Sequence, residues 1–243
     1  MSPLILITRP RDAADAFAAD LEDTLGPDAD ICIAPLLRIE MSPVLPDLAP
    51  YRTLIFTSAH AVESVAKATR RRDFACYVVG TGTGTVAAQH GFDPVVGPGT
   101  GKELAQDIRN ASVATPCLYL RGDPIAFDLA RYLNSAGTET HEAIVYRQVP
   151  CALSNKALDR VERHGIVVAP VFSPRSAQLL LDALPKGSTL HVAAISEAVA
   201  GIFPRNRAAR ISVAARPDRP AMLSCVAQLW SDANRLESGG TAQ

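Results

Sequence analysis

Short apolar segments alternate with amphipathic segments along the whole chain, and this alternation constrains the fold more than any other feature. Leu4–Ile7, Thr53–Thr57 and Ile166–Phe172 are rich in branched aliphatic residues, and each precedes a segment in which apolar residues recur at helical spacing. A strand that recurs before each helix is typical of βαβ units around a parallel sheet. The sequence therefore predicts an α/β protein, with helices at 13–25, 61–69, 83–90, 125–136, 176–184 and 197–203.

Two parts of the chain carry similar short motifs in the same order. Phe56–Ser58 lies 116 residues before Phe172–Pro174, and Val79-Gly80 lies the same distance before Ile195-Ser196. Weak internal similarity of this kind indicates two domains of similar architecture. We therefore expect two parallel-sheet domains.

Charge and hydropathy exclude several classes of function. The 24 basic residues are balanced by 25 acidic ones, so the chain has no overall basic charge of the kind that binds nucleic-acid backbones. The longest apolar stretches, such as Ile166–Phe172, are seven residues long, whereas a membrane helix needs about 20. The apolar run Leu4–Ile7 has no basic residue before it and is followed by Arg9 and Arg11, unlike a signal peptide. The sequence predicts a cytoplasmic protein without nucleic-acid or membrane partners.

No cofactor or metal motif is complete. The glycine-rich segment Gly80–Gly84 departs from the dinucleotide fingerprint because Thr85 stands where the third glycine belongs. Gly97–Lys102 is one residue short of a phosphate-binding loop, and Glu103 follows where a serine or threonine would hold magnesium. The histidines show no metal-ligand spacing, and no G-x-S-x-G motif is present. The sequence thus predicts neither a cofactor nor a metal.

The five cysteines are scattered and never form a C-x-x-C pair, so we expect neither a disulfide framework nor a zinc site. They are Cys32, Cys76, Cys117, Cys151 and Cys225.

Small polar residues and arginines gather at six predicted strand-to-helix junctions. The carboxyl ends of parallel strands form the edge at which α/β sheets bind ligands, and the N–H groups that begin the next helix favour anions. Arginine adds a planar fork that binds carboxylates. The junctions therefore predict a polyanionic small-molecule ligand. They are Thr8–Pro10, Thr57-Ser58, Gly80-Thr81, Arg121–Pro124, Ser173-Pro174 and Ser196-Glu197.

A structural explanation exists for each junction taken alone. Asp123 and Ser173 are both followed by proline, which is the pattern of a helix N-cap with proline at the first helical position. Arg70–Arg72 follows a predicted helix and indicates a solvated turn that complements the helix dipole.

Several motifs, in this order, resemble the uroporphyrinogen-III synthase family, and the resemblance runs from residue 4 to about residue 230. They are Leu6–Pro10, Leu54–Ala59, Val79-Gly80 with Thr83, Leu120–Asp123, Val145–Arg147 and Phe172–Pro174. The resemblance implies two α/β domains joined by a two-stranded β linker, with the substrate in the cleft between them. The first domain would be discontinuous, comprising residues 1–35 and 150–243. The second would be residues 41–141, and the linker residues 36–40 and 142–149.

The resemblance also implies a reaction. The substrate would be hydroxymethylbilane, which bears eight carboxylates and loses water as it closes to uroporphyrinogen III with its D ring inverted. The enzyme would be a lyase that needs no cofactor. It would act as a monomer and make transient contact with the preceding deaminase.

The resemblance places Tyr146 beside the cleft, and we expect its phenol, which is protonated at pH 7, to donate the proton that lets the substrate hydroxyl leave. The alternative is a packed linker residue with a solvated hydroxyl. Val199 stands where the family often has a threonine, so Ser196 is the nearby hydroxyl. The residues implied in substrate binding are Arg9, Thr57, Ser58, Ala59, Gly80, Thr83, Arg121, Gly122, Ser173, Pro174 and Ser196. The competing functions are a non-catalytic two-domain binding or sensor module for a small polyanion and, more remotely, a nucleotide-dependent enzyme.

Overall fold

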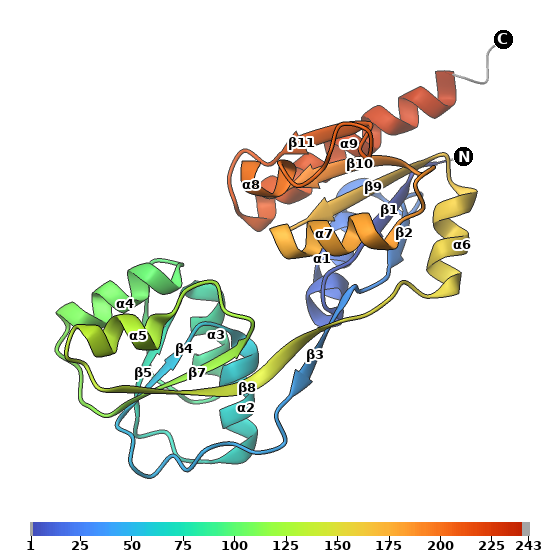
Figure 1. The fold of residues 1–243 in the computed structure, drawn as a ribbon. Coiled ribbons are helices and arrows are strands. Elements are labelled where there is room, and N and C mark those ends of the chain that lie inside the picture. Colours follow the sequence, from blue (N-terminus) through green and yellow to red (C-terminus); the bar gives the residue numbers. More distant parts are fainter. Residues whose placement is uncertain (1, 240–243) are drawn as a thin grey trace. The chain divides into compact units, whose positions relative to one another are not determined.

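The chain folds as an α/β protein with two mostly parallel sheets, as a computed structural model that describes residues 2–239 shows (Figure 1). The predicted fold class is confirmed. The chain divides into two compact units: unit 1 contains the residues up to Arg38 and those from Val149 onward, and unit 2 contains Ile39–Gln148.

Unit 1 has a five-stranded sheet in the order β11-β10-β9-β1-β2, and all of these pairs are parallel. Its elements are β1 (Leu4–Ile7), α1 (Arg11–Leu25), β2 (Asp30–Ile33), α6 (Asn155–Arg163), β9 (Ile166–Val171), α7 (Pro174–Ala183), β10 (Thr189–Ala194), α8 (Glu197–Ala200), β11 (Arg210–Val213) and α9 (Arg219–Gly239).

Strand β1 shows why this sheet is covered on both faces. All four of its side chains are fully buried, and they alternate between two cores because successive residues of a strand point to opposite faces. Leu4 and Leu6 join the core that contains residues of α6 and α7, while Ile5 and Ile7 join the core formed with α1 and α9. A continuous apolar run without polar alternation is typical of a parallel strand buried on both sides.

Unit 2 has a six-stranded sheet in the order β3-β8-β7-β4-β5-β6. Ile55 packs toward α4 and α5, whereas Leu54 and Phe56 pack toward α2. Its elements are β3 (Leu37–Met41), β4 (Thr53–Phe56), α2 (Ala59–Ala68), β5 (Ala75–Val78), α3 (Thr81–Gln89), β6 (Pro94–Val96), α4 (Gly101–Asn110), β7 (Cys117–Asp123), α5 (Leu129–Ser135) and β8 (Thr140–Pro150).

The chain passes from one unit to the other within strands β3 and β8, which are neighbours in the six-stranded sheet. The Ser42 amide donates to the Val145 carbonyl over 2.9 Å just beyond β3. The boundary between the units therefore falls within two neighbouring strands, and the linker bounds 36–40 and 142–149 stay a prediction.

The predicted helix at 125–136 begins later than expected, at Leu129, and the prediction of Asp123 as its N-cap was wrong. Asp123 is the last residue of β7 and pairs with Arg147 of β8, which keeps it extended. The residue before a proline also disfavours helical geometry. Asp128 caps the helix instead, accepting a hydrogen bond from the Arg131 amide.

The predicted cap at Ser173 is confirmed. Its hydroxyl accepts a hydrogen bond from the Ser176 amide over 3.1 Å, and Pro174 is the first residue of α7.

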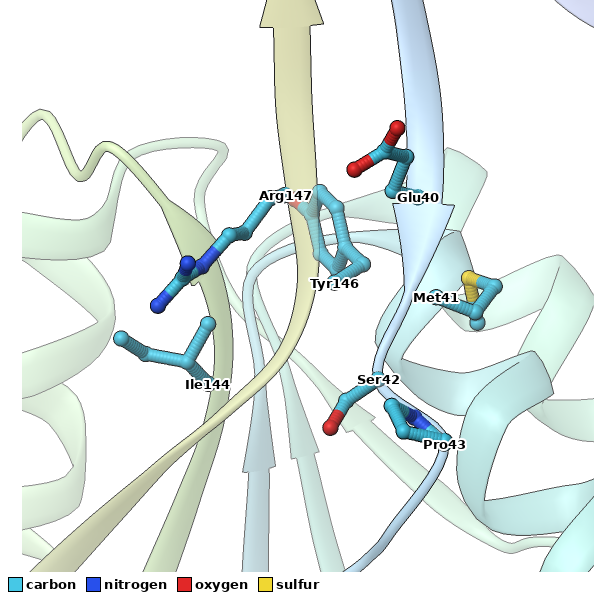
Figure 2. A pocket seen from close by; sticks show the side chains of 7 residues that line it. All are labelled: Glu40, Met41, Ser42, Pro43, Ile144, Tyr146 and Arg147. Carbon is cyan, nitrogen blue, oxygen red and sulfur yellow. The ribbon is translucent and has the colours of Figure 1, made fainter.

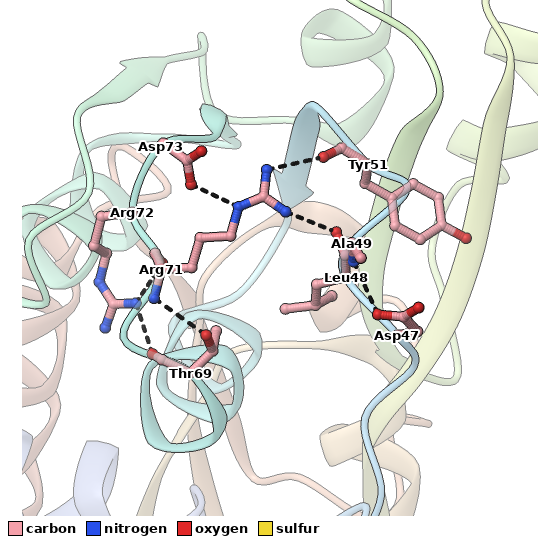
Figure 3. Close-up of polar contacts among 8 residues, drawn as sticks. All are labelled: Asp47, Leu48, Ala49, Tyr51, Thr69, Arg71, Arg72 and Asp73. Atoms are coloured by element: carbon pink, nitrogen blue, oxygen red, sulfur yellow. Dashed lines mark hydrogen bonds and ion pairs between the residues drawn. The ribbon is translucent and has the colours of Figure 1, made fainter.

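The prediction that Arg70–Arg72 is a solvated turn was wrong for Arg71, which closes a loop (Figure 3). Its guanidinium donates to the carbonyls of Leu48 and Tyr51 and pairs with Asp73 over 2.6 Å. These carbonyls lie in a segment without regular structure, so the arginine supplies donors that a strand or helix would otherwise provide.

Arg72 performs a similar role at two helix ends. It donates to the carbonyls of Thr69, Arg71 and His90, at distances of 2.8, 2.7 and 2.6 Å. Its guanidinium carbon also lies 4.4 Å from the centroid of the Phe92 ring. Unpaired carbonyls are a normal feature of helix C-termini, and this side chain satisfies them. Only Arg70 is exposed, as the sequence predicted.

Among the helices of residues 2–239, none is sufficiently long and apolar to span a bilayer.

Candidate active site

In unit 2, most of the predicted site residues lie at the carboxyl edge of the sheet. Thr57 and Ser58 follow β4, Gly80 follows β5, and Arg121 and Gly122 lie near the end of β7. Because β7, β4 and β5 are parallel neighbours, these ends meet at one edge. Tyr146, on the adjacent strand β8, pairs in register with Gly122.

A cavity of about 380 Å³ opens at this edge and brings together Thr57, Gly122 and Tyr146. Tyr119, the turn Gly99–Gly101 and the segment from Pro124 to Phe127 complete most of its lining. The cavity therefore combines the hydroxyl groups of Thr57 just after β4, Tyr119 of β7 and Tyr146 of β8 with the backbone of a glycine-rich turn.

The Tyr146 side chain is buried, with 6% of its surface exposed. Burial raises the pKa of its phenol, and a hydrogen bond with Ser58 opposes that effect. The His60 ring packs edge-on against it, with the centroids 5.4 Å apart. The phenol is therefore protonated at neutral pH and is a hydrogen-bond donor in a largely apolar setting.

Tyr146 also lines a second cavity of about 250 Å³ beside strands β3 and β8 (Figure 2). Figure 2 shows Ile144, Tyr146 and Arg147 projecting from β8, and Glu40 and Met41 from β3. The lining residues are Glu40, Met41, Ser42, Pro43, Ile144, Tyr146 and Arg147. The tyrosine ring is thus common to both cavities of this region.

Arg121 does not present an open fork to the cavity. Its Nη2 and Nε donate to the Glu142 carboxylate over 2.7 and 3.1 Å, and its Nη1 donates to the Gly122 carbonyl. The hydrogen bonds to Glu142 raise the pKa of Arg121, since they stabilise the charged form. In this structure the guanidinium is therefore committed to an ion pair with the neighbouring strand.

Close packing explains why a glycine follows β5, without a bound dinucleotide. Gly80 precedes α3, and a Cβ at this position would lie 3.3 Å from the Cα of Gly99. Two turns therefore approach closely here. Thr83 is buried within α3, and Ala59 is the first residue of α2.

In unit 1, the predicted residues Arg9, Ser173 and Ser196 follow three strands that are adjacent in the sheet, namely β1, β9 and β10. The Ser173 hydroxyl is engaged as the cap of α7, which begins at Pro174. Ser196 precedes α8, but its side chain makes no capping hydrogen bond there.

Arg9 is the strongest candidate for anion binding in unit 1. Its guanidinium carbon lies 3.9 Å from the centroid of the Phe172 ring, in a cavity of about 430 Å³ that Arg219 also lines. Burial lowers the pKa of Arg9, and the positive charge of Arg219 lowers it further. Arg219 pairs with Asp20, whereas within the described part of the chain Arg9 has no hydrogen bond or ion pair. A carboxylate would relieve the repulsion.

A metal site is not formed by the described residues: they contain no group of three His, Cys, Asp or Glu side chains that could hold an ion.

The family model described as uroporphyrinogen-III synthase HemD matches residues 15–224, which is most of the chain. The chain belongs to the uroporphyrinogen-III synthase family. Enzymes of haem biosynthesis form this family, and the resemblance in the sequence is therefore confirmed. No curated protein sequence matches the chain.

Solved uroporphyrinogen-III synthases share the fold. The enzyme from Helicobacter pylori is 16% identical, with a TM-score of 0.66 over 94% of this chain and all of that chain. A mutant enzyme from Thermus thermophilus is also 16% identical, with a TM-score of 0.56 over 96% of this chain and 98% of that chain.

Sequence reasoning missed three contributors to these cavities. Tyr119 lies inside the apolar run of β7, where a single phenol among buried neighbours was the available signal. The turn Gly99–Gly101 lies within Gly97–Lys102, where the incomplete phosphate-binding motif gave no indication of a site. Arg219 lies 210 residues after Arg9 in the sequence, and nothing local indicates that they share a cavity.

Proposed function

We propose that this member of the uroporphyrinogen-III synthase family is a cofactor-independent lyase that closes hydroxymethylbilane to uroporphyrinogen III. The observation that carries the proposal is the buried Tyr146 phenol in a cavity shared with Thr57 and Gly122. The family match supports the substrate class, because it covers most of the chain.

Tyr146 supplies the proton in the first step. The bond between the terminal methylene and its hydroxyl breaks, the electron pair leaves with oxygen, and the phenol proton completes a water molecule. A general acid needs to be protonated before it acts, and burial keeps this phenol so. The bilane is left as a cationic azafulvene.

Ring closure is mainly a problem of positioning. The cationic methylene is attacked by the D-ring carbon that already carries the bridge to ring C, which gives a spiro intermediate. That older bridge bond then breaks, leaving a second azafulvene cation on ring C, and the free α carbon of the D ring attacks this cation, so that the D ring is inverted. When the macrocycle forms, the proton lost from the D-ring α carbon returns to the phenolate, so the net products are uroporphyrinogen III and one molecule of water. A cavity that holds the two ends of the bilane together favours closure with inversion over the direct closure that occurs in solution.

Each unit contains residues that we propose for carboxylate binding. Arg9 is the main anion-binding group, because it is charged, stacked on Phe172 and without an ion-pair partner among residues 2–239. Arg121 contributes less, since Glu142 already occupies its fork. The other proposed binding residues are Thr57, Ser58, Ala59, Gly80, Thr83, Gly122, Ser173, Pro174 and Ser196.

The test is a coupled assay. A deaminase generates hydroxymethylbilane in the presence of the purified, chelator-treated protein, and the products are oxidised and resolved as porphyrin isomers. Isomer III is the expected main product without added metal, nucleotide or flavin. If only isomer I forms, as in spontaneous closure, the protein is instead a binding or sensor module for a polyanion.

We further infer that the protein is a cytoplasmic monomer that receives the bilane through transient contact with the deaminase. Sedimentation should give the mass of one chain, and cell fractionation should recover the protein with cytoplasmic markers. Crosslinking during turnover should capture the deaminase. A stable dimer or a membrane-bound pool would contradict this part.

A further inference from the structure

Tyr119 and Thr57 form a hydrogen-bonded pair at the site proposed for the substrate. The Tyr119 hydroxyl lies 3.0 Å from Thr57 Oγ1. Tyr119 belongs to strand β7, and Thr57 directly follows the neighbouring strand β4. Tyr119 is only 3% exposed. Nevertheless, both residues line the same 380 Å³ cavity as Tyr146.

Among the described residues, the two hydroxyl groups form hydrogen bonds only with each other, so the pair keeps one proton unused. Whichever oxygen donates within the pair, the other hydroxyl retains a hydrogen that can be donated to a guest, because each hydroxyl has one donor and two acceptor positions. The cavity is the space available to that guest. The pair is therefore a preformed donor for a substrate oxygen.

Burial keeps the Tyr119 hydroxyl of this donor pair neutral. Burial raises the pKa of the Tyr119 phenol, while the hydrogen bond with Thr57 and the charge of Arg121 oppose the change. The charge of Arg121 is itself paired with Glu142. Among the described residues, no charged side chain lines this cavity, so a hydroxyl donor has little competition from charge.

We propose that the Thr57–Tyr119 pair is a second hydrogen-bond donor of the substrate site, distinct from Tyr146, and that it holds an oxygen of the bilane by its unused O–H. The guest oxygen belongs either to the leaving hydroxyl or to a carboxylate, and both accept the same hydrogen bond. This inference rests on the proposed function, because it takes the bilane as the guest.

The first experiment compares Tyr119→Phe with Tyr132→Phe. Phenylalanine keeps the ring and removes one hydroxyl. Tyr132 is a matched control because it lies in the same unit, and its hydroxyl binds Arg109 outside the cavity. Loss of one neutral hydrogen bond predicts that Tyr119→Phe lowers kcat/KM for the bilane about three- to tenfold, with Tyr132→Phe unchanged.

Whether Tyr119→Phe changes kcat or KM identifies which substrate oxygen the pair binds. If the pair holds the leaving hydroxyl, Tyr119→Phe lowers kcat; if it holds a carboxylate, the variant raises KM. Thr57→Val should reproduce the loss, and Thr57→Ser should restore activity because it retains the hydroxyl. Since the residues act as one unit, the Thr57→Val/Tyr119→Phe double variant should lose little more than the worse single variant.

A purely structural pair would behave differently. It would lower the melting temperature while leaving both kinetic constants of the folded protein unchanged, and that outcome overturns the inference. Equal losses in Tyr119→Phe and Tyr132→Phe would also overturn it.

The porphyrin isomer that the wild-type protein produces tests the proposed function separately. If the wild type yields only isomer I, the synthase proposal fails, and the pair is then tested by stopped-flow binding of hydroxymethylbilane before it closes. Weaker binding by Tyr119→Phe than by Tyr132→Phe still supports the donor role. Equal binding by both variants, or no binding, rejects it.

Discussion

Gly122 and Tyr146 occupy facing positions on adjacent strands, and the edge of the tyrosine ring, nearest at Cζ, lies where a side chain of Gly122 would begin. A Cβ on Gly122 would be 2.6 Å from the Tyr146 hydroxyl oxygen. The register of β7 and β8 shifts between Arg121 and Gly122, and this bulge sets Gly122 opposite Tyr146. The position of the phenol therefore depends on the absence of a side chain across from it.

We expect Gly122→Ala to displace the Tyr146 ring. The added methyl group should destabilise the protein by about 1–3 kcal/mol, as overpacking does, and reduce kcat more than the loss of stability accounts for. Chemical unfolding and coupled-assay kinetics measure the two effects. Gly187→Ala is the control, because a Cβ there has no neighbour within 4 Å. Wild-type kinetics in Gly122→Ala would show that the ring position is unimportant.

Tyr146→Phe should slow single turnover about 10- to 1,000-fold, within the range for loss of a positioned general acid when substrate groups or water can stand in for it. Isomer III should still dominate, because ring inversion depends on how the chain ends are held. The pKa of Tyr146 is raised, so the acid form persists through neutral and mildly alkaline pH, and the wild-type rate should not fall there through this group. An unaltered rate in the variant removes the acid role, and a slow variant that makes mostly isomer I would make Tyr146 a positioning residue.

Arg9→Ala should raise KM for the bilane by about ten- to a hundredfold, the effect of one charge-assisted contact. The difference in KM between Arg9→Ala and the wild type should shrink as salt is added, since salt screens the attraction between Arg9 and a substrate carboxylate in the wild type. Arg11→Ala provides the comparison: Arg11 is exposed and pairs with Asp15 over 2.8 Å. If both variants give the same KM as the wild type, the stacked guanidinium of Arg9 is a structural feature.

Arg72→Met should destabilise unit 2 by about 1–3 kcal/mol, because carbonyls that now accept its hydrogen bonds would lose their donor. Thermal unfolding measures the change. Arg70→Met removes an equal charge from the adjacent, exposed residue and should have little effect. Equal shifts in the two variants would mean that net charge, rather than the hydrogen bonds, matters.

His191 should make the protein less stable in acid. It is buried on β10, and its Nδ1 has no hydrogen-bond partner among the described residues. Burial and then the charge of Arg210 lower its pKa below 6.5, although Asp232 opposes this. Above pH 6.5 neither state binds the proton, whereas below it the unfolded state binds it first, so stability falls as the pH falls.

The measurement is the unfolding free energy at about pH 7.5 and about pH 5.5, the interval around the unperturbed histidine pKa. His191→Leu should reduce the difference, and His90→Gln, at an exposed position, should preserve it. A difference that is identical in wild type and His191→Leu would assign the acid effect to other groups.

The strand-to-helix alternation was sufficient to predict the fold class and to bring Thr57 and Gly122 to one edge, because parallel strands align their carboxyl ends. It could not predict the pairing of Arg121 with Glu142. That contact depends on the register of β7 and β8, and no local pattern encodes which side chains face each other across two strands. Tyr119 was missed for a similar reason: its hydroxyl matters only because Thr57 lies on the neighbouring strand.

Unit 2 is inserted within unit 1, and this order has a consequence for biosynthesis. Strand β1 lies between β2 and β9, yet the ribosome makes β9 only after all of unit 2. Unit 2 is therefore the first to have its full sequence available and can fold while translation continues, as domains generally do. During that interval the apolar strand Leu4–Ile7 can pair with β2 but not with β9, which has not yet been synthesised. The nascent chain should depend most on chaperones during this period, and slowing translation after unit 2 should prolong its exposure.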